Sequence, residues 1–209
     1  MKLAKIFFDF DGTLLDTWLR SYAAYKFAVT NLHGTIISFQ EFVSFKKNGM
    51  GDGKILIKSG LSESSAGSYN KFINDSIEEP SFLLYDTLFE WVKPFLGFLN
   101  HYSYLFLLTS RRNPKYCEWQ IEKLQIRHLL DKIFIVRDKF EVLKDYGLER
   151  IIIVTDNESD IVLGNRGKWT TVAVTWGHRN SSVLEKCKPT HIINTPQSLF
   201  LLLYWSIKP

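Results

Sequence analysis

The chain has 209 residues, of which 45% are apolar and 23% charged, a composition that excludes a disordered or fibrous protein. Its 26 Lys and Arg against 22 Asp and Glu give a net charge of +4, far from the charge density of a nucleic-acid-binding protein. The two cysteines, Cys117 and Cys187, cannot build a disulfide framework or a thiolate zinc cluster, so we expect a cytoplasmic protein. The longest apolar stretch, 199–205, is much shorter than the roughly 20 residues of a bilayer span, and we expect no membrane association.

Continuous apolar runs of strand length recur along the chain, and each is followed by a helical pattern. Because the runs do not alternate with polar residues, they are typical of parallel strands buried on both faces. We place the strands at 4–8, 104–108, 133–136, 151–154 and 171–174. We place the crossover helices between them at 115–124, 140–146 and 160–168. This alternation predicts an α/β fold with a doubly wound, Rossmann-like parallel sheet.

Residues 16–85 interrupt this order, because they contain no apolar run typical of a buried strand. Gly and Ser separate the helix-like stretches of this segment, which we place at 19–32, 39–47, 55–58 and 65–77. We interpret the segment as a small all-helical insertion in the sheet domain. The predicted organisation is a Rossmann-like core of residues 1–15 and 86–209 and a helical insertion of residues 16–85.

Two acids follow the first predicted strand in the sequence Asp-Phe-Asp-Gly-Thr-Leu, which begins at Asp9 and has its second acid at Asp11. Side chains at the carboxyl end of a parallel strand enter the crevice where α/β sheets bind ligands. Two carboxylates there can act as a nucleophile and a proton shuttle, or bind a divalent cation through hard oxygens. The alternative is a strand followed by a simple Asp-Gly turn, but the apolar run directly before the motif favours a functional site.

Polar side chains also follow the later strands. Thr109 and Ser110 end the second strand, Lys139 opens the helix after the third, and Asp156 ends the fourth, with Asp160 four residues further on. The hydroxyls can donate to a phosphoryl oxygen, and a lysine among acids can bind a phosphate. Each of these residues also has a simpler interpretation, as a helix cap or a solvated surface charge.

Together, these motifs resemble those of the haloacid dehalogenase superfamily of phosphohydrolases. The Asp-x-Asp-Gly-Thr-Leu segment, the threonine at a strand end, the lysine and the Asp-x-x-x-Asp pair occur in the superfamily's order. Residues 171–178 are similar to the segment after the fourth motif in phosphoglycolate-phosphatase-like members, which carry a helical cap where this chain has its insertion. The resemblance implies a Mg²⁺-dependent phosphoric monoester hydrolase that acts on a small phosphorylated metabolite.

The resemblance also implies roles for individual residues. Asp9 would be the nucleophile that forms an aspartyl-phosphate, and Asp11 would protonate the leaving oxygen and then activate water. Thr109, Ser110 and Lys139 would bind the phosphoryl oxygens.

The implied Mg²⁺ site consists of the carboxylates of Asp9 and Asp156 and the backbone carbonyl of Asp11. Asp160 would orient these groups or reach the metal through water. The chain departs from the family pattern at the fourth motif, where Thr155 stands in place of the usual Gly.

The third motif departs as well, because no Pro follows Lys139 and only 17 positions separate it from Asp156. Lys144 and Lys132 are therefore rival candidates for its lysine.

Several alternative functions remain open at this stage. Dehalogenases lack the second acid, so Asp11 favours phosphate chemistry. Sugar phosphomutases commonly have Val where Thr13 stands, which makes a phosphomutase the minor alternative. An idle binding protein on this scaffold would usually have lost a motif acid. A nucleic-acid-end phosphatase is suggested by the pI of about 8.9, but residues 16–85 carry seven basic and seven acidic residues and no evident basic groove.

Substrate choice would be set by the cap. The segment 46–54 is rich in glycine and contains Lys47 and Lys54, which could meet a second anion on the substrate. Arg111, which follows the second motif, could add positive charge near the site. The simpler interpretation of the segment is a flexible connector with solvated lysines.

Overall fold

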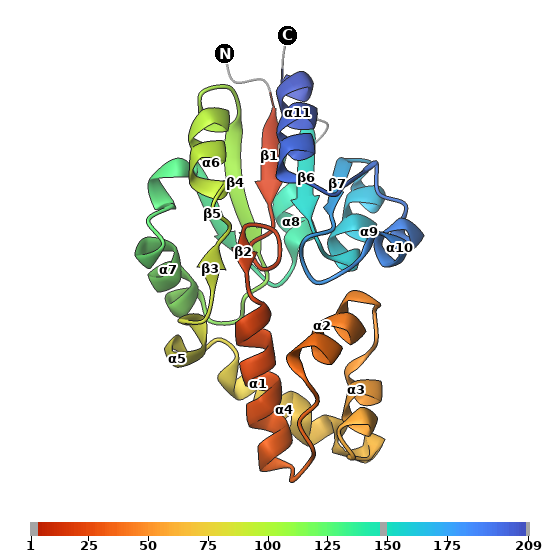
Figure 1. Ribbon diagram of the computed structural model, residues 1–209. Coiled ribbons are helices and arrows are strands. Elements are labelled where there is room, and N and C mark those ends of the chain that lie inside the picture. Colours follow the sequence, from red (N-terminus) through yellow and green to blue (C-terminus); the bar gives the residue numbers. More distant parts are fainter. Residues whose placement is uncertain (1–3, 147–149, 208–209) are drawn as a thin grey trace. The chain divides into compact units, whose positions relative to one another are not determined.

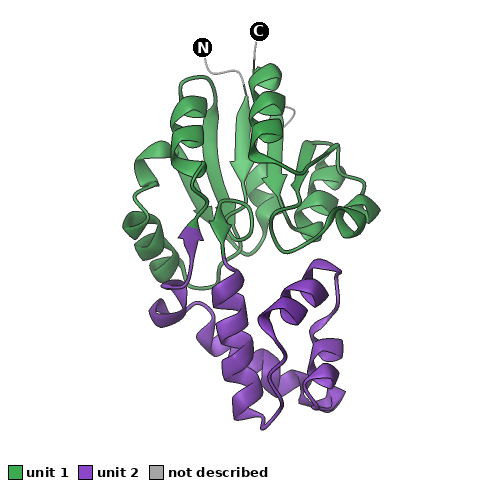
Figure 2. Cartoon of the chain, in the orientation of Figure 1, with its two compact units in different colours: residues 1–16, 88–209 green, residues 17–87 purple. Residues whose placement is uncertain are grey.

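The computed structural model describes residues 4–146 and 150–207 (Figure 1). The chain divides into two compact units, which are residues 1–16 with 88–209 (unit 1) and residues 17–87 (unit 2), as Figure 2 shows. The boundaries expected from the sequence lie within two residues of these.

Unit 1 is built on a six-stranded sheet in the order β5-β4-β1-β6-β7-β8. Every neighbouring pair is parallel, and Phe8 of β1 lies opposite Leu107 on one side and Val154 on the other. The strands are β1 (Lys5–Phe8), β4 (Tyr104–Thr109), β5 (Lys132–Ile135), β6 (Ile151–Thr155), β7 (Thr170–Val174) and β8 (His191–Ile193). The predicted doubly wound parallel sheet is confirmed, and each predicted strand is displaced by at most one residue at either end.

Helices cover both faces of this sheet. They are α6 (Val92–Asn100), α7 (Pro114–Lys123), α8 (Lys139–Lys144), α9 (Glu158–Gly167), α10 (Ser181–Leu184) and α11 (Pro196–Ile207), with 3₁₀ turns η2 (Arg127–Leu129) and η3 (Glu185–Cys187). In Figure 1, α6 and α11 lie in front of the sheet and α8 lies behind it.

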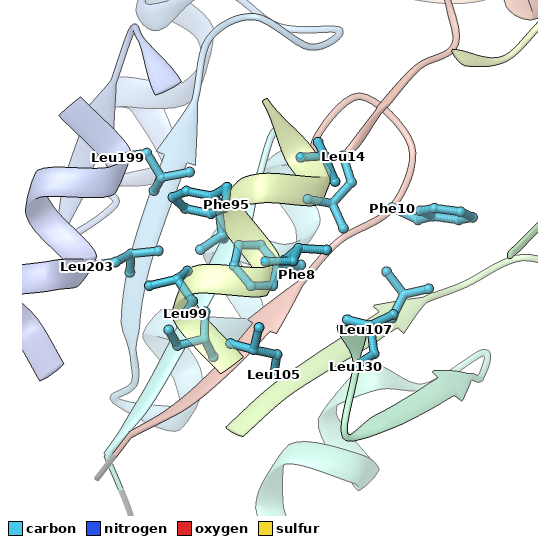
Figure 3. Packing of buried hydrophobic residues seen from close by; sticks show 14 of the residues in the cluster. Phe8, Phe10, Leu14, Phe95, Leu99, Leu105, Leu107, Leu130, Leu199 and Leu203 are labelled. Atoms are coloured by element: carbon cyan, nitrogen blue, oxygen red, sulfur yellow. The ribbon is translucent and has the colours of Figure 1, made fainter. Parts of the chain in front are cut away.

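The apolar core of unit 1 explains why its strands are continuously apolar. Phe8 packs with α6 and α11 in one cluster, whereas Phe7 packs with Leu143 of α8 in another, because successive side chains of a strand point to opposite faces. Figure 3 shows the first cluster, in which β1, β4, α6 and α11 contribute Phe8, Leu105, Phe95, Leu99, Leu199 and Leu203.

Unit 2 has an apolar core of its own. Its elements are α1 (Trp18–Asn31), α2 (Phe39–Lys47), α3 (Asp52–Lys58), the 3₁₀ turn η1 (Glu63–Ser65), α4 (Ala66–Ser76) and α5 (Pro80–Leu83). The core is centred on Tyr25, whose hydroxyl lies 2.7 Å from the Ser59 hydroxyl and accepts a hydrogen bond from the Ile37 amide at 3.0 Å. A buried ion pair between Arg20 Nε and Asp86 Oδ1, at 3.2 Å, also belongs to this unit.

One prediction about the insertion is wrong in detail. The helix placed at 55–58 begins at Asp52, because an acid in the first turn stabilises a helix start. Lys54 therefore lies in α3 and not in a loop, and Lys46 forms an ion pair with Asp52.

Two short strands, β2 (Leu15–Asp16) and β3 (Thr87–Leu88), pair with each other where the chain passes between the units. In the part of the chain that the structure describes, no helix is long and apolar enough to cross a membrane.

Candidate active site

The candidate site begins in the turn after β1. The Asp9 amide donates to the Val154 carbonyl at 2.9 Å, so Asp9 continues the strand by one residue. The chain then turns at Gly12, whose φ of +75° is a conformation that glycine adopts without strain. A Cβ at Gly12 would lie 2.1 Å from Asp156 Oδ2, and one at Gly177 would lie 2.3 Å from the same oxygen. Glycine at both positions is therefore required for the two loops to approach Asp156.

Lys139 joins two of the acids. Its ammonium lies 2.9 Å from Asp9 Oδ1 and 2.6 Å from Asp160 Oδ2, and its side chain is buried. Asp160 also accepts a hydrogen bond from the Thr155 hydroxyl at 3.0 Å. Thr155 stands where the family pattern has Gly. Its hydroxyl orients Asp160, and Asp160 in turn binds the ammonium of Lys139.

The rival lysines are placed elsewhere. Lys144 is the exposed last residue of α8 and forms an ion pair with Glu141. Lys132 is an exposed residue of β5 whose ammonium lies over the Phe134 ring. Of the three candidates, Lys139 is the one whose ammonium contacts Asp9.

The charges of this cluster do not balance. Burial raises the pKa of Asp9 to about 7, and the charges of Asp160 and Asp156 act in the same direction against the opposing effect of Lys139. Burial alone would lower the pKa of Lys139, but the charges of Asp9 and Asp160 outweigh it and raise that pKa above its usual 10.5. The ammonium of Lys139 contacts two carboxyl groups, and the charge of Asp156 acts on Asp9 as well, so the surroundings of Asp9 carry a surplus of negative charge.

Asp156 is held by residues from two loops. Its amide donates to the Thr13 hydroxyl at 3.1 Å, and its Oδ2 lies 2.7 Å from the His178 amide and 3.0 Å from His178 Nδ1. Trp176 Nε1 donates to the Thr13 carbonyl at 3.1 Å and so ties the loops together. In the sequence, the only signal for these contacts of Thr13 and His178 is that both residues lie inside motif segments.

Asp11 is paired with Arg111. The guanidinium donates from Nε to Asp11 Oδ2 at 3.1 Å and from Nη2 to Asp11 Oδ1, and its Nη1 donates to Gln120 Oε1 at 2.7 Å. Arg111, which the sequence suggests as added positive charge near the site, binds the second acid of the motif in the structure. The planar fork of a guanidinium matches the two oxygens of a carboxylate, which no sequence spacing reveals.

The other predicted residues fall into two groups. Thr109 is the buried last residue of β4, next to β1, and Ser110 is exposed directly after it, so both lie at the sheet edge that carries Asp9. Lys47 and Lys54 belong to unit 2.

The residues of unit 1 fit the implied magnesium ion in their chemistry. The carboxylates of Asp9 and Asp156 and the backbone carbonyl of Asp11 are all hard oxygen donors, the ligands that Mg²⁺ prefers. The surplus negative charge around Asp9 is what a divalent cation would offset. Among the described residues, no group of three or more His, Cys, Asp or Glu side chains is gathered as a metal site. The side-chain carboxylate of Asp11 binds Arg111, whereas its backbone carbonyl is the group that would bind the metal.

Comparison with known proteins identifies the family. The model of the haloacid dehalogenase-like hydrolases matches residues 6–174. The chain belongs to this family. The resemblance seen in the motifs is thus confirmed, and the chain is an enzyme of a hydrolase family that includes phosphatases.

Similar proteins match the chain over almost its whole length. Pyrophosphatase PpaX of Bacillus mycoides (strain KBAB4) is 22% identical, with 97% of this chain and 98% of the relative covered. PpaX of Bacillus anthracis (strain A0248) is 23% identical, with 97% of each chain covered.

Solved structures share the fold. A haloacid dehalogenase-like hydrolase from Streptococcus pneumoniae superposes with a TM-score of 0.77 at 21% identity, covering 97% of this chain and 98% of that one. A predicted phosphoglycolate phosphatase from Haemophilus somnus 129PT has a TM-score of 0.74 at 16% identity, covering 97% and 99%. These neighbours include the phosphoglycolate-phosphatase-like branch expected from the motifs.

Proposed function

We propose that the protein is a Mg²⁺-dependent phosphatase that hydrolyses a small phosphorylated metabolite in the cytoplasm through an aspartyl-phosphate. The observation that carries this proposal is the contact of Lys139 with Asp9 at the end of β1, beside a second acid two residues away. The names of the relatives, pyrophosphatase and predicted phosphoglycolate phosphatase, agree with phosphate chemistry.

In the first half of the reaction, an oxygen of the Asp9 carboxylate attacks phosphorus. The new bond to phosphorus forms as the bond to the leaving-group oxygen breaks, and that oxygen keeps the electron pair and takes the proton of Asp11. Lys139 lies beside Asp9 and offsets the charge of the phosphoryl oxygens, and the Thr109 hydroxyl donates a hydrogen bond to one of them.

In the second half, Asp11 removes a proton from a water molecule whose oxygen attacks phosphorus. The bond between Asp9 and phosphorus breaks, which restores the Asp9 carboxylate and releases inorganic phosphate. The sum is one ester and one water converted to one alcohol and one phosphate. A bound Mg²⁺ would supply positive charge that offsets the repulsion between the phosphate and the acids.

The contacts of the remaining acids fit supporting roles. Thr13 and His178 donate to the carboxyl group of Asp156. Asp160 accepts from the ammonium of Lys139 and is itself held by the Thr155 hydroxyl. We assign these residues the task of keeping the donors in place, which is how surrounding groups orient ligands and catalytic side chains.

Turnover of p-nitrophenyl phosphate by the purified protein tests the proposal. We expect hydrolysis with Mg²⁺, its loss in excess EDTA, and no turnover by Asp9→Asn, because the amide cannot form the acyl-phosphate. Asp75→Asn, an exposed change in α4, serves as the matched control and should keep full activity. Absence of turnover with Mg²⁺, Mn²⁺ or Co²⁺ would overturn the proposal and favour a binding protein on this scaffold.

A further inference from the structure

The ion pair between Arg111 and Asp11 is a feature that the proposed reaction does not use. The guanidinium binds both oxygens of the carboxylate, with Nε at 3.1 Å from Oδ2 and Nη2 in contact with Oδ1. The arginine side chain is 3% exposed and that of Asp11 is 31% exposed. The arginine is therefore buried, whereas the pair remains open to solvent on the aspartate side.

The guanidinium is held so that one edge faces the site. Its Nη1 donates to the Oε1 of Gln120, a buried residue of α7, and its carbon lies 5.1 Å from the centre of the Phe10 ring. These two contacts leave Nε and Nη2 directed at Asp11. The edge that they form is the one that binds carboxylates and phosphates in a bidentate manner.

The pairing conflicts with the role proposed for Asp11. A general acid must turn one oxygen of its carboxyl group toward the leaving oxygen of the substrate. In the structure, both oxygens accept hydrogen bonds from Arg111. The pair must therefore open during the reaction, and a buried guanidinium without a counter-anion is strongly unfavourable.

A substrate with a second anion resolves this conflict. We propose that Arg111 selects phosphate compounds whose leaving group carries a carboxylate or phosphate, by transferring its ion pair from Asp11 to that group. The transfer keeps the guanidinium paired and frees the Asp11 carboxyl group to face the leaving oxygen. This inference rests on the proposed phosphatase activity and adds to it a residue that determines substrate class.

A matched set of substrates tests the transfer. Ethyl phosphate and carboxymethyl phosphate differ chiefly in the second anion, inorganic pyrophosphate presents a phosphate in its place, and p-nitrophenyl phosphate measures basal activity. In Arg111→Ala, we expect kcat/KM for the better anionic substrate to fall about 10- to 100-fold more than for ethyl phosphate, since charge-assisted hydrogen bonds are lost. The substrate with the larger loss of kcat/KM, carboxymethyl phosphate or pyrophosphate, shows whether Arg111 binds a carboxylate or a phosphate.

Two further variants sharpen the comparison. Arg111→Lys keeps the charge but not the fork, so we expect an intermediate loss of preference. Arg112→Ala removes the same charge from the exposed neighbouring residue and should leave the preference unchanged. An equal loss of preference in Arg112→Ala would assign the effect to net charge and overturn the inference.

Inhibition provides a measurement that needs no turnover of the anionic substrates. With p-nitrophenyl phosphate as substrate, the wild-type protein should bind methylenediphosphonate or phosphonoacetate more tightly than methylphosphonate, and Arg111→Lys should reduce that difference. If the wild type shows no such preference, or if Arg111→Ala lowers kcat/KM equally for all substrates, the inference fails while the phosphatase stands. If the wild type hydrolyses none of the substrates with Mg²⁺ present, the proposed function itself fails.

Discussion

Lys139 shows how a single residue acquires a function from its surroundings. An exposed lysine at the start of a helix is disfavoured by the helix dipole, yet Lys139 opens α8. Its ammonium is buried between Asp9 and Asp160, and their charges raise its pKa above the usual 10.5, so it is protonated near neutral pH. The same contacts assign it, among the rival lysines, to the candidate site.

Replacing Lys139 by Ala should therefore lower kcat for aryl and alkyl phosphates alike, by about 100-fold or more, as when a transition-state donor is removed. Because two buried acids lose their partner, the variant is also expected to be less stable, and thermal unfolding should be recorded with it. Lys139→Arg keeps the charge if the alanine variant does not fold. Lys144→Ala is the matched control. A severe loss in that control with a mild one in Lys139→Ala would contradict the assignment.

Asp11 provides a second test at this scale. Asp11→Asn removes the proton donor but keeps the shape of the side chain. We expect about 100-fold or greater loss of kcat on alkyl phosphates and a smaller loss on p-nitrophenyl phosphate, whose leaving group needs little protonation. The ratio of the two losses is the measurement. Equal losses would show that Asp11 is not the general acid.

Helix α2 illustrates how an element begins at a defined residue. The Ser38 hydroxyl accepts from the Glu41 amide at 3.3 Å, and the Glu41 carboxylate accepts from the Ser38 amide at 3.0 Å, a reciprocal capping box. The hydrogen bonds from Ser38 lower the pKa of Glu41. The start of α2 is thereby stabilised by groups within four residues of sequence.

Ser38→Ala should destabilise unit 2 by about 1 kcal/mol, as measured by urea unfolding. The Glu41 part of the box depends on pH. Because the pKa of Glu41 is lower in the folded state, its contribution is present above the usual 4.5 and is lost as the pH falls through the folded-state value. Glu41→Gln should therefore destabilise unit 2 near neutral pH and have little effect at a pH below that value. The same destabilisation at both would contradict the capping account.

The whole molecule separates two tasks, since the residues proposed for phosphoryl chemistry all belong to unit 1 and the expected cap lysines to unit 2. Each unit has its own apolar core. The effect of a substitution in one unit on activity or stability should therefore be measurable while the other unit stays folded.

Metal binding should stabilise unit 1. With Mg²⁺ at about 100 times its Kd, linkage gives about 2.7 kcal/mol, a rise of several degrees in the Tm of unit 1. Asp156→Asn should lose most of this rise, and Asp75→Asn should keep it. KCl at equal ionic strength controls for screening. An equal rise with KCl would show that the effect is not a specific site.

Substrate selection is the corresponding test of unit 2. If this unit reads the leaving group, Lys47→Ala or Lys54→Ala should raise KM for the physiological substrate, found by screening phosphorylated metabolites, and change p-nitrophenyl phosphate hydrolysis little. Lys58→Ala, at the exposed end of α3, is the control. If both lysines are silent on every substrate, residues 46–54 do not determine the substrate.

The sequence by itself determined the layers of unit 1 and the positions of the motif acids. A strand buried on both faces must be continuously apolar, and an acid at its end is visible as the point where that run stops. The sequence does not reveal strand β8, because it has three residues and none of them is buried. It does not reveal helix α11 either, because that helix is apolar on most of its surface and lacks a clear helical period.

Only the tertiary structure decided which side chains meet. Lys139 and Asp160 are 21 positions apart, His178 and Asp156 are 22, and Arg111 and Asp11 are 100. No spacing rule links such pairs, because the path of the chain through the sheet brings the ends of different strands to one edge. The ion pair of Arg111 with Asp11 depends on where a long side chain ends and on the buried Gln120 that directs it.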